Sequence, residues 1–312
     1  MPTRRAGLIF LFAVDMPEAL PLLKNIRRRK MRVVTLVENT KQEGRDDLTA
    51  EHGLSLYIEH RGQHILFDTG ATDAFARNAE KLGVDLEIVD ALVISHHHYD
   101  HGGGLARFLE LNQKAKIYLR KSKEENFYFR ALGIINKYIG LDQELLRKHA
   151  GRFEWVEGFT RILPGVSILT EIPRPYDLPR GNRKLFVKKG GTYEPDDFGH
   201  ELILVMEEQE NLVVFTGCSH NGILNMMAAV TRQFPDKPIK AVFGGFHLVG
   251  LPILNTMAGS KGEVRAMGKE LLKYPVERVY TGHCTGKKAY RVLKEVMAQT
   301  LEDFPAGRAI VL

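Results

Sequence analysis

Residues 95–104 read SHHHYDHGGG and follow an apolar run that is typical of a buried strand. Side chains alternate along an extended chain, so His96 and His98 point to the same side, whereas Asp100 and His101 fall in the turn that follows. The glycines allow the backbone to fold tightly around these side chains. Neutral imidazoles and a carboxylate would hardly share so small a surface without a cation, since both are ligands of divalent metals. The segment therefore predicts a metal site at a strand end.

The order of apolar strand, glycine and histidine recurs three times in the second half of the chain. It appears as LVVFTGCSH at 212–220, as AVFGGFH at 241–247 and as VYTGHC at 279–284. Strands that end in this way can bring their ligands together on one rim of a sheet structure. The recurrence favours a site assembled from distant segments over a solvated polyhistidine turn.

Hydrophobic periodicity predicts the elements that carry these segments. The predicted strands are 31–38, 54–60, 63–68, 91–95, 116–119, 166–170, 202–207, 212–216, 239–243 and 278–281. The predicted helices are 72–82, 104–112, 142–149, 222–233, 262–273 and 286–300. Strands come in two batches, each followed by helices, and no internal repeat is present. This order predicts an α/β fold of two packed sheets with helices outside, rather than a regular β-α-β alternation.

One domain is expected over residues 31–312, preceded by an extension of uncertain order at residues 1–30. The extension superficially resembles a signal peptide, but acidic residues follow its apolar run and no cleavage site appears, so secretion is not expected. Residues 120–200 are irregular and rich in Lys, Arg, Pro and Gly. A long segment of this kind predicts a cap-like insertion over the site.

Composition excludes several classes of protein. Of the 312 residues, 44% are hydrophobic and 26% are charged, which is ordinary for a globular protein and excludes disorder, collagen and coiled coil. No apolar run reaches the roughly 18 to 20 residues of a membrane span. A net charge of +6 favours anionic ligands, but the basic residues are scattered and form no nucleic-acid-binding motif. The two cysteines stand beside histidines, which indicates site chemistry and a cytoplasmic location rather than a disulfide framework.

The chain resembles the metallo-β-lactamase superfamily over roughly residues 31–312. The resemblance rests on FDTG at 67–70, on the H-x-H-x-D-H pattern at 96–101, and on the Gly-His pair at 282–283 after a strand. It implies an αβ/βα sandwich with a metal site at the sheet edge. The segments GLSLYIE, GCSHNGILN, GGFHL and TGHCTG are similar to the 7,8-dihydropterin-6-methyl-4-(β-D-ribofuranosyl)aminobenzene 5'-phosphate synthases. That group joins a dihydropterin diphosphate to an aminobenzene ribose phosphate in methanopterin biosynthesis.

The resemblance also implies two divalent metal ions per chain. It assigns His96, His98 and His220 to the first ion and Asp100, His101 and His283 to the second. Zinc is the favoured metal, with iron and manganese as alternatives, because three nitrogen ligands suit all three. His200 competes with His220 as a ligand, and the strand-end position favours His220.

Cys218 departs from the superfamily pattern, because most members have a bridging aspartate at that position. Three alternatives follow: the thiolate bridges the two ions, a water alone bridges them, or the second site is weak and fills only with substrate. Asp100, Cys218 and His247 are candidates for catalysis. His247 could bind substrate or shuttle a proton, and a core histidine is the alternative. Asp68 is expected to accept an N–H from a metal-bound imidazole.

The candidates for substrate binding are Glu51, His52, Arg183 and Lys287. Helices predicted to begin directly after the ligand loops would aim their N-termini at the same rim, which suits a small anionic or phosphorylated substrate. The sequence thus predicts a metal-dependent transferase that acts on such a substrate. The alternatives are a metal-dependent hydrolase of a phosphoester, lactone or thioester, and a redox-sensing protein that uses Cys218 and Cys284 as thiols. Nothing in the sequence indicates the oligomeric state.

Overall fold

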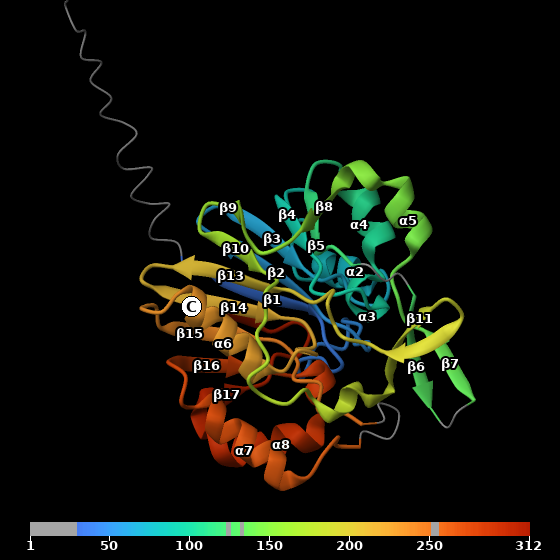
Figure 1. The fold of residues 1–312 in the computed structure, drawn as a ribbon. Helices are drawn as coiled ribbons and strands as arrows, with labels where there is room; N and C mark the ends of the chain where they lie inside the picture. The colour runs from blue at the N-terminus through green and yellow to red at the C-terminus, as the bar shows by residue number, and fades with distance from the viewer. Residues whose placement is uncertain (1–29, 123–125, 132–133, 251–255) are drawn as a thin grey trace, which may run out of the picture.

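The structure is a computed structural model that describes residues 30–122, 126–131, 134–250 and 256–312. Two seven-stranded sheets pack face to face, with helices on both outer sides (Figure 1). In order across the first sheet, the strands are β18 (Ala309–Val311), β1 (Arg32–Val37), β2 (Ser55–His60), β3 (Gln63–Phe67), β4 (Ala91–Val93), β5 (Lys116–Arg120) and β8 (Phe153–Val156). Across the second they are β17 (Leu301–Glu302), β16 (Val276–Tyr280), β15 (Ile239–Phe243), β14 (Asn211–Thr216), β13 (Ile203–Glu208), β10 (Val166–Leu169) and β9 (Phe159–Leu163).

Each sheet is antiparallel on one side and parallel on the other. Strands β1, β2 and β3 pair antiparallel, whereas β3, β4, β5 and β8 run parallel. In the second sheet, β13 and β14 are antiparallel, and β14 to β17 are parallel. Local β-α-β units therefore occur in each half, although the chain as a whole does not alternate regularly. The carboxyl ends of parallel strands meet at one edge of a sheet, and such edges are where ligand sites form.

Alternating apolar side chains fill the space between the sheets. Val33 on β1, Phe67 on β3 and Phe215 on β14 lie in this central core, whereas Val34 and Leu36 on β1 face the helices. Burying each such side chain contributes about 1.5–3 kcal/mol to the stability of the fold. Because successive side chains of a strand point to opposite faces, each sheet packs against the other sheet on one face and against helices on the other. The predicted αβ/βα sandwich is confirmed.

Helices cover the outer face of each sheet. The first sheet packs against α2 (Ala74–Lys81), α4 (Leu105–Leu111) and α5 (Gln143–Lys148). The second packs against α6 (Ile223–Gln233), α7 (Lys261–Leu271) and α8 (Lys287–Met297). A single turn, α3 (Tyr99–Gly102), carries part of the histidine-rich segment. Within the described ranges no helix is both long and apolar enough to cross a membrane.

The predicted cap region, 120–200, is divided between two structures. Strands β8, β9 and β10 lie in the main sheets, because their apolar side chains, such as Val156 and Ile168, enter the central core. The region is therefore not one insertion. Outside the sandwich, a four-stranded sheet has the order β12 (Thr192–Pro195), β11 (Leu185–Lys189), β6 (Phe127–Ala131) and β7 (Ile135–Tyr138). Its Phe127 ring lies 5.9 Å from the His98 ring, so this small sheet covers part of the histidine-rich segment.

Residues 1–29 of the predicted N-terminal extension lie outside the described residues.

Candidate metal centre

Three parallel strands deliver the ligand loops of the second sheet to one edge. Phe215 on β14 pairs with Phe243 on β15, and Phe243 pairs with Tyr280 on β16. Because these strands are in register, the loops that carry Cys218, His247 and His283 all leave from the same edge. The sequence pattern of strand, glycine and histidine reflects this register.

Gly217 lets a loop from the second sheet meet the histidine-rich loop from the first. A Cβ at position 217 would collide with Ser95 Oγ and would lie 3.0 Å from His96 Nδ1. Only a residue without a side chain allows the two backbones to approach this closely.

The first group consists of His96, His98 and His220, whose ligand atoms lie within 4.8 Å of one another. All three rings are buried, and the Nε2 atom of each lacks a hydrogen-bond partner. An imidazole nitrogen in that condition is costly, since buried polar atoms are nearly always paired. The three unpartnered atoms fit a cation between them.

Hydrogen bonds on the far side of two rings fix where their protons are. The Ser95 hydroxyl donates to Asp68 Oδ2 (2.8 Å), so it accepts from His96 Nδ1 (2.8 Å). Asn182 Nδ2 donates to the His220 carbonyl, which leaves its Oδ1 to accept from His220 Nδ1 (3.0 Å). Both Nδ1 atoms therefore carry the proton, and the Nε2 lone pairs point into the group.

Burial keeps these rings neutral. Burial and the neighbouring His200 lower the pKa of His98 to about 3. Burial and the other rings also hold the pKa values of His96 and His220 well below the ordinary value. Neutral imidazoles are the form that binds a metal, so the first group is ready for one at neutral pH.

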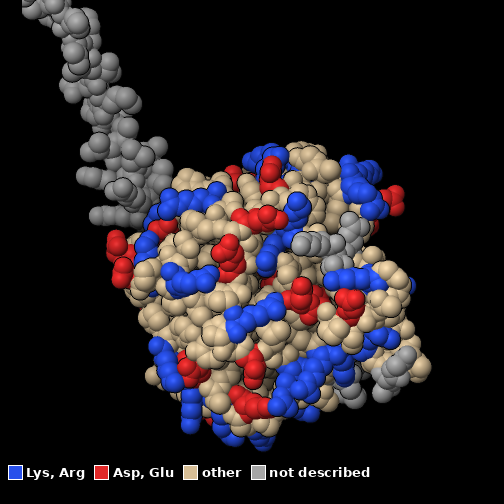
Figure 2. All heavy atoms as spheres, viewed as in Figure 1, with Lys and Arg blue, Asp and Glu red and all other residues tan. Residues whose placement is uncertain are grey.

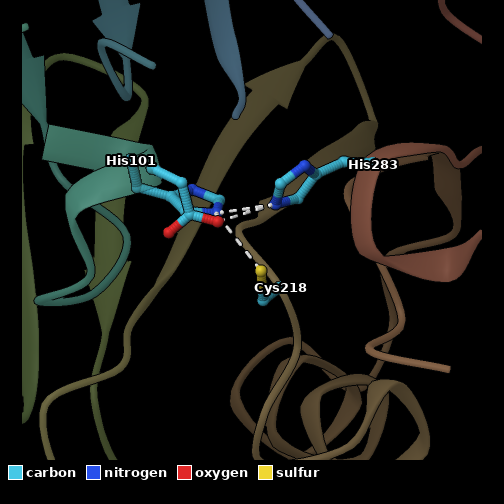
Figure 3. A group of neighbouring side chains, drawn as sticks. His101, Cys218 and His283 are labelled. Carbon is cyan, nitrogen blue, oxygen red and sulfur yellow. Dashed lines mark hydrogen bonds and ion pairs between the residues drawn. The ribbon is translucent and has the colours of Figure 1, made fainter. Parts of the chain in front are cut away.

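The second group consists of Asp100, His101, Cys218 and His283 (Figure 3). His101 Nε2 lies 3.2 Å from His283 Nε2 and 3.2 Å from Cys218 Sγ. Asp100 Oδ2 lies 3.4 Å from His283 Nε2. Nitrogen, oxygen and sulfur ligands therefore converge on one point from both sheets.

Both imidazoles of the second group also face acceptors through Nδ1. His101 Nδ1 lies 2.6 Å from Asp68 Oδ2, and His283 Nδ1 lies 2.8 Å from Asn39 Oδ1. With the protons on Nδ1, two Nε2 lone pairs face each other at 3.2 Å, which repels unless a cation or a proton lies between them. Burial lowers the pKa of His101, but the Asp68 and Asp100 carboxylates outweigh it and raise that pKa above its ordinary value. The residues of this group thus fit a divalent metal.

Three buried carboxylates hold the ligand loops in place. Asp68 Oδ1 accepts the Ser95 backbone N–H at 2.7 Å. Glu38 Oε1 accepts the His283 N–H at 2.6 Å, and Glu201 Oε1 accepts the His220 N–H at 2.7 Å. The sequence predicted this kind of role for Asp68 alone, because FDTG is a motif.

Glu38 follows β1 and Glu201 precedes β13, and no local sequence pattern distinguishes either residue. The same is true of Asn39 and Asn182, which orient the rings of His283 and His220.

His200 differs from His220 in having both ring nitrogens occupied. Its Nδ1 accepts the His97 backbone N–H at 3.1 Å, and its Nε2 lies 3.0 Å from Asp196 Oδ2. Its atoms also lie close to those of His98 and Asp196. Because His220 alone offers a free lone pair, the geometry supports His220 as the proposed ligand.

His247 and His52 lie beside the two groups. His247 has a buried, unpartnered Nδ1 and a left-handed φ of 47°, and its ring lies 4.2 Å from the His220 ring. His52 is 43% exposed, and its Nε2 lies 3.3 Å from Asp100 Oδ2. Asn39 Nδ2 donates to His52 Nδ1, which places the His52 proton on Nε2, toward Asp100.

Glu51 orders a loop next to the centre. Its carboxylate accepts hydrogen bonds from the Ala71 and Thr72 backbones and from the Thr72 hydroxyl. Both oxygens of the Glu51 carboxylate are thus engaged within the protein. Its role in substrate binding stays a prediction.

Arg183 and Lys287 are exposed. Arg183 follows Asn182 in the short 3-10 helix η2 (Arg180–Lys184), and Lys287 begins α8. Figure 2 shows a group of Lys and Arg side chains at the lower right of the face in view. Over the rest of that face, basic and acidic side chains are interspersed.

Comparison with known proteins agrees with this geometry. A family model described as the metallo-beta-lactamase superfamily matches residues 48–283. A 7,8-dihydropterin-6-methyl-4-(beta-D-ribofuranosyl)-aminobenzene-5'-phosphate synthase of Methanocaldococcus jannaschii is 28% identical over 84% of this chain and 90% of its own. An uncharacterized protein of the same organism is 30% identical over 84% of this chain and 93% of its own.

Among solved structures, Tm1679 is described as a metal-dependent hydrolase of the beta-lactamase superfamily. It is 33% identical to this chain, with a TM-score of 0.75, and the match covers 90% of this chain and 99% of Tm1679.

Proposed function

This chain belongs to the metallo-β-lactamase superfamily, and from that premise we propose that it is a metal-dependent enzyme acting on a phosphorylated small molecule. The observation that carries the proposal is the pair of Nε2 atoms of His101 and His283, which face each other at 3.2 Å with their protons turned outward. Beside them lie three further buried Nε2 atoms without partners. A cation in each group would satisfy all of these nitrogens, whereas a proton could relieve only the facing pair.

We assign one ion to His96, His98 and His220, and a second to a set formed by Asp100, His101 and His283. Zinc is the first choice, and iron or manganese would accept the same nitrogen-rich sets. Divalent ions in such a pair supply charge that stabilises negative oxygen atoms in a displacement reaction.

The remaining residues of the centre hold its geometry and receive the substrate. Asp68, Glu38 and Glu201 fix the ligand loops through their hydrogen bonds to Ser95, His283 and His220. His52 stands on the exposed side of the second group with its N–H toward Asp100, where it can also donate to a substrate oxygen.

Basic residues that lie close to ligand loops along the chain support a phosphorylated substrate. The η2 helix brings Arg183 directly after Asn182, which contacts His220. The helix α8 begins at Lys287, two positions after the His283–Thr285 turn, so its N-terminus and its lysine lie close along the chain to a ligand. Helix N-termini and basic side chains both favour phosphate.

The reaction we favour is transfer of the pterin group of a dihydropterin diphosphate to an aminobenzene ribose phosphate. Diphosphate is the leaving group. The similarity to a synthase of that name supports it. The aromatic amine forms the new bond, the bond to the diphosphate oxygen breaks, and the amine proton leaves to solvent. Cys218 and Cys284 are both free thiols. Free thiols are typical of a reducing compartment, so we propose a cytoplasmic location.

Hydrolysis of a phosphoester, lactone or thioester is the second candidate, and the similarity to a metal-dependent hydrolase favours it. The two reactions differ in the fate of water. Purified metal-loaded enzyme is incubated with the two proposed substrates in oxygen-18 water, and the products are analysed by mass spectrometry.

Free diphosphate together with an unlabelled condensation product supports transfer. Label in the organic product, formed without the amine, supports hydrolysis. A His283→Ala variant serves as the inactive control, because it lacks one of the facing imidazoles.

A further inference from the structure

Cys218 stands between the two groups of metal ligands. Its Sγ lies 3.2 Å from His101 Nε2 and belongs to the set that includes Asp100 and His283. The same Sγ lies within 4.8 Å of ligand atoms of His220 and His247. Since His220 is also a member of the first group, one sulfur atom is close to ligands of both.

We propose that Cys218 binds both metal ions as a shared thiolate, an inference that rests on the metal-dependent function proposed above. On binding, the S–H bond breaks, its proton goes to solvent, and sulfur forms a bond to each ion, with no change of oxidation state. Thiolate ligands favour zinc, cobalt and iron over magnesium and manganese. The shared sulfur therefore makes this centre selective for thiophilic metals.

Cys284 is the matched comparison within the same chain. It is buried like Cys218, at 4% against 3% exposure, and it follows the ligand His283 directly. Its Sγ accepts the His247 backbone N–H at 3.3 Å and lies 3.5 Å from the Cys218 carbonyl oxygen. Among the described residues it belongs to no group of potential metal ligands. Its thiol contacts the backbone of His247 and Cys218 and also the Cys218 thiol, rather than a set of metal ligands.

The test loads the metal-free full-length protein with cobalt(II) and follows the sulfur-to-cobalt charge-transfer absorption in the near ultraviolet. We expect the band to grow with both the first and the second equivalent in the wild type and in Cys284→Ser. We expect Cys218→Ser to lose the band, and to bind the second equivalent more than tenfold more weakly. Far-UV circular dichroism of each variant checks the fold.

Cys218→Asp is the second variant, and it keeps the test valid if the serine variant folds poorly. A carboxylate can also span two ions, so this variant should hold two cobalt ions without the sulfur band. The inference is overturned if Cys218→Ser or Cys218→Asp keeps the band, or if the wild-type band stops growing after one equivalent.

The test also separates this inference from the function on which it rests. Two bound cobalt ions with no sulfur band would leave the metal-dependent function standing and would remove the shared thiolate. No cobalt binding by the wild type would overturn both.

Discussion

His101 Nε2 and His283 Nε2 lie 3.2 Å apart although the two residues are separated by 182 positions in the chain. His101 lies in α3, the single turn that follows β4 of the first sheet, and His283 follows β16 of the second. Asp68 and Asn39 accept the Nδ1 protons of these rings, so the lone pairs face each other. Side chains from both sheets therefore meet at this edge as a set of potential metal ligands. A cation bound to them would raise the free energy of unfolding.

Removing one ligand from either group should remove metal without unfolding the protein. His98→Ala and His283→Ala each delete one of the converging nitrogens, so we expect each variant to lose metal and activity, with far-UV circular dichroism near that of the wild type. Elemental analysis after dialysis measures the loss. His97→Gln is the control, because His97 Nε2 contacts the Arg120 carbonyl instead and that variant should keep its metal. Full metal content in His98→Ala or His283→Ala would refute that ligand.

The hydrogen bonds behind the ligands should matter almost as much as the ligands. Asp68 accepts from His101 Nδ1, from the Ser95 hydroxyl and from the Ser95 backbone. Asp68→Asn replaces one accepting oxygen by a donor, so we expect metal affinity to fall by about 10- to 100-fold. Competition with a chelator of known affinity measures the change. Asp73→Asn is the control, because Asp73 is an exposed N-cap residue whose carboxylate pairs with Arg77, and an equal effect there would argue against the assigned role.

Gly217 should tolerate no side chain. A Cβ at this position would collide with Ser95 Oγ, so Gly217→Ala should cost about 1–3 kcal/mol of unfolding free energy by overpacking. It should also displace His96 and weaken metal binding. Gly151→Ala is the matched control, because a Cβ there meets nothing within 4 Å, and it should change stability by less than about 0.5 kcal/mol. Urea unfolding of both metal-free variants decides between these outcomes.

A buried histidine away from the metal centre should destabilise the protein in acid. His60 Nε2 donates to the Glu207 carbonyl at 3.0 Å, and burial together with the Arg61 charge lowers the pKa of His60 from 6.5 to about 4. Between these two values the unfolded chain binds a proton that the native chain does not. The free energy of unfolding should therefore fall by about 1.4 kcal/mol per pH unit as the pH decreases through this window.

The measurement compares His60→Gln with its parent by urea unfolding at several pH values. Both proteins carry Glu208→Gln, because Glu208 lies 3.0 Å from His60 Nδ1 and burial raises the pKa of that carboxyl. The parent should lose stability in acid faster than the variant. Identical slopes would mean that His60 does not titrate in the way described.

The main elements of the fold could be predicted because they obey burial periodicity. The strand predicted at 239–243 is observed with those bounds as β15, and the helix predicted at 222–233 is observed as Ile223–Gln233. The strands of the small sheet and the edge strands of the two main sheets were not predicted. All four residues of β7 are exposed, so no alternation of buried and exposed side chains marks it. Strand β17 has two residues, too few to show a period.

The groups that converge at the centre were predicted from strand ends, whereas the residues that orient them were not. His96, His98 and His220 stand in repeated local patterns, and the structure brings their ligand atoms together. Asn39 meets His283 across 244 positions, and only the pairing of the two sheets creates that contact. A residue whose role depends on a partner so distant carries no local signal.

The central claim is that this edge holds two divalent ions, and metal content tests it most directly. The purified, untagged chain is reconstituted with zinc, dialysed, and analysed for zinc, iron and manganese per mole of protein. The account predicts about two ions per chain. A chain that stays free of metal after reconstitution would contradict it.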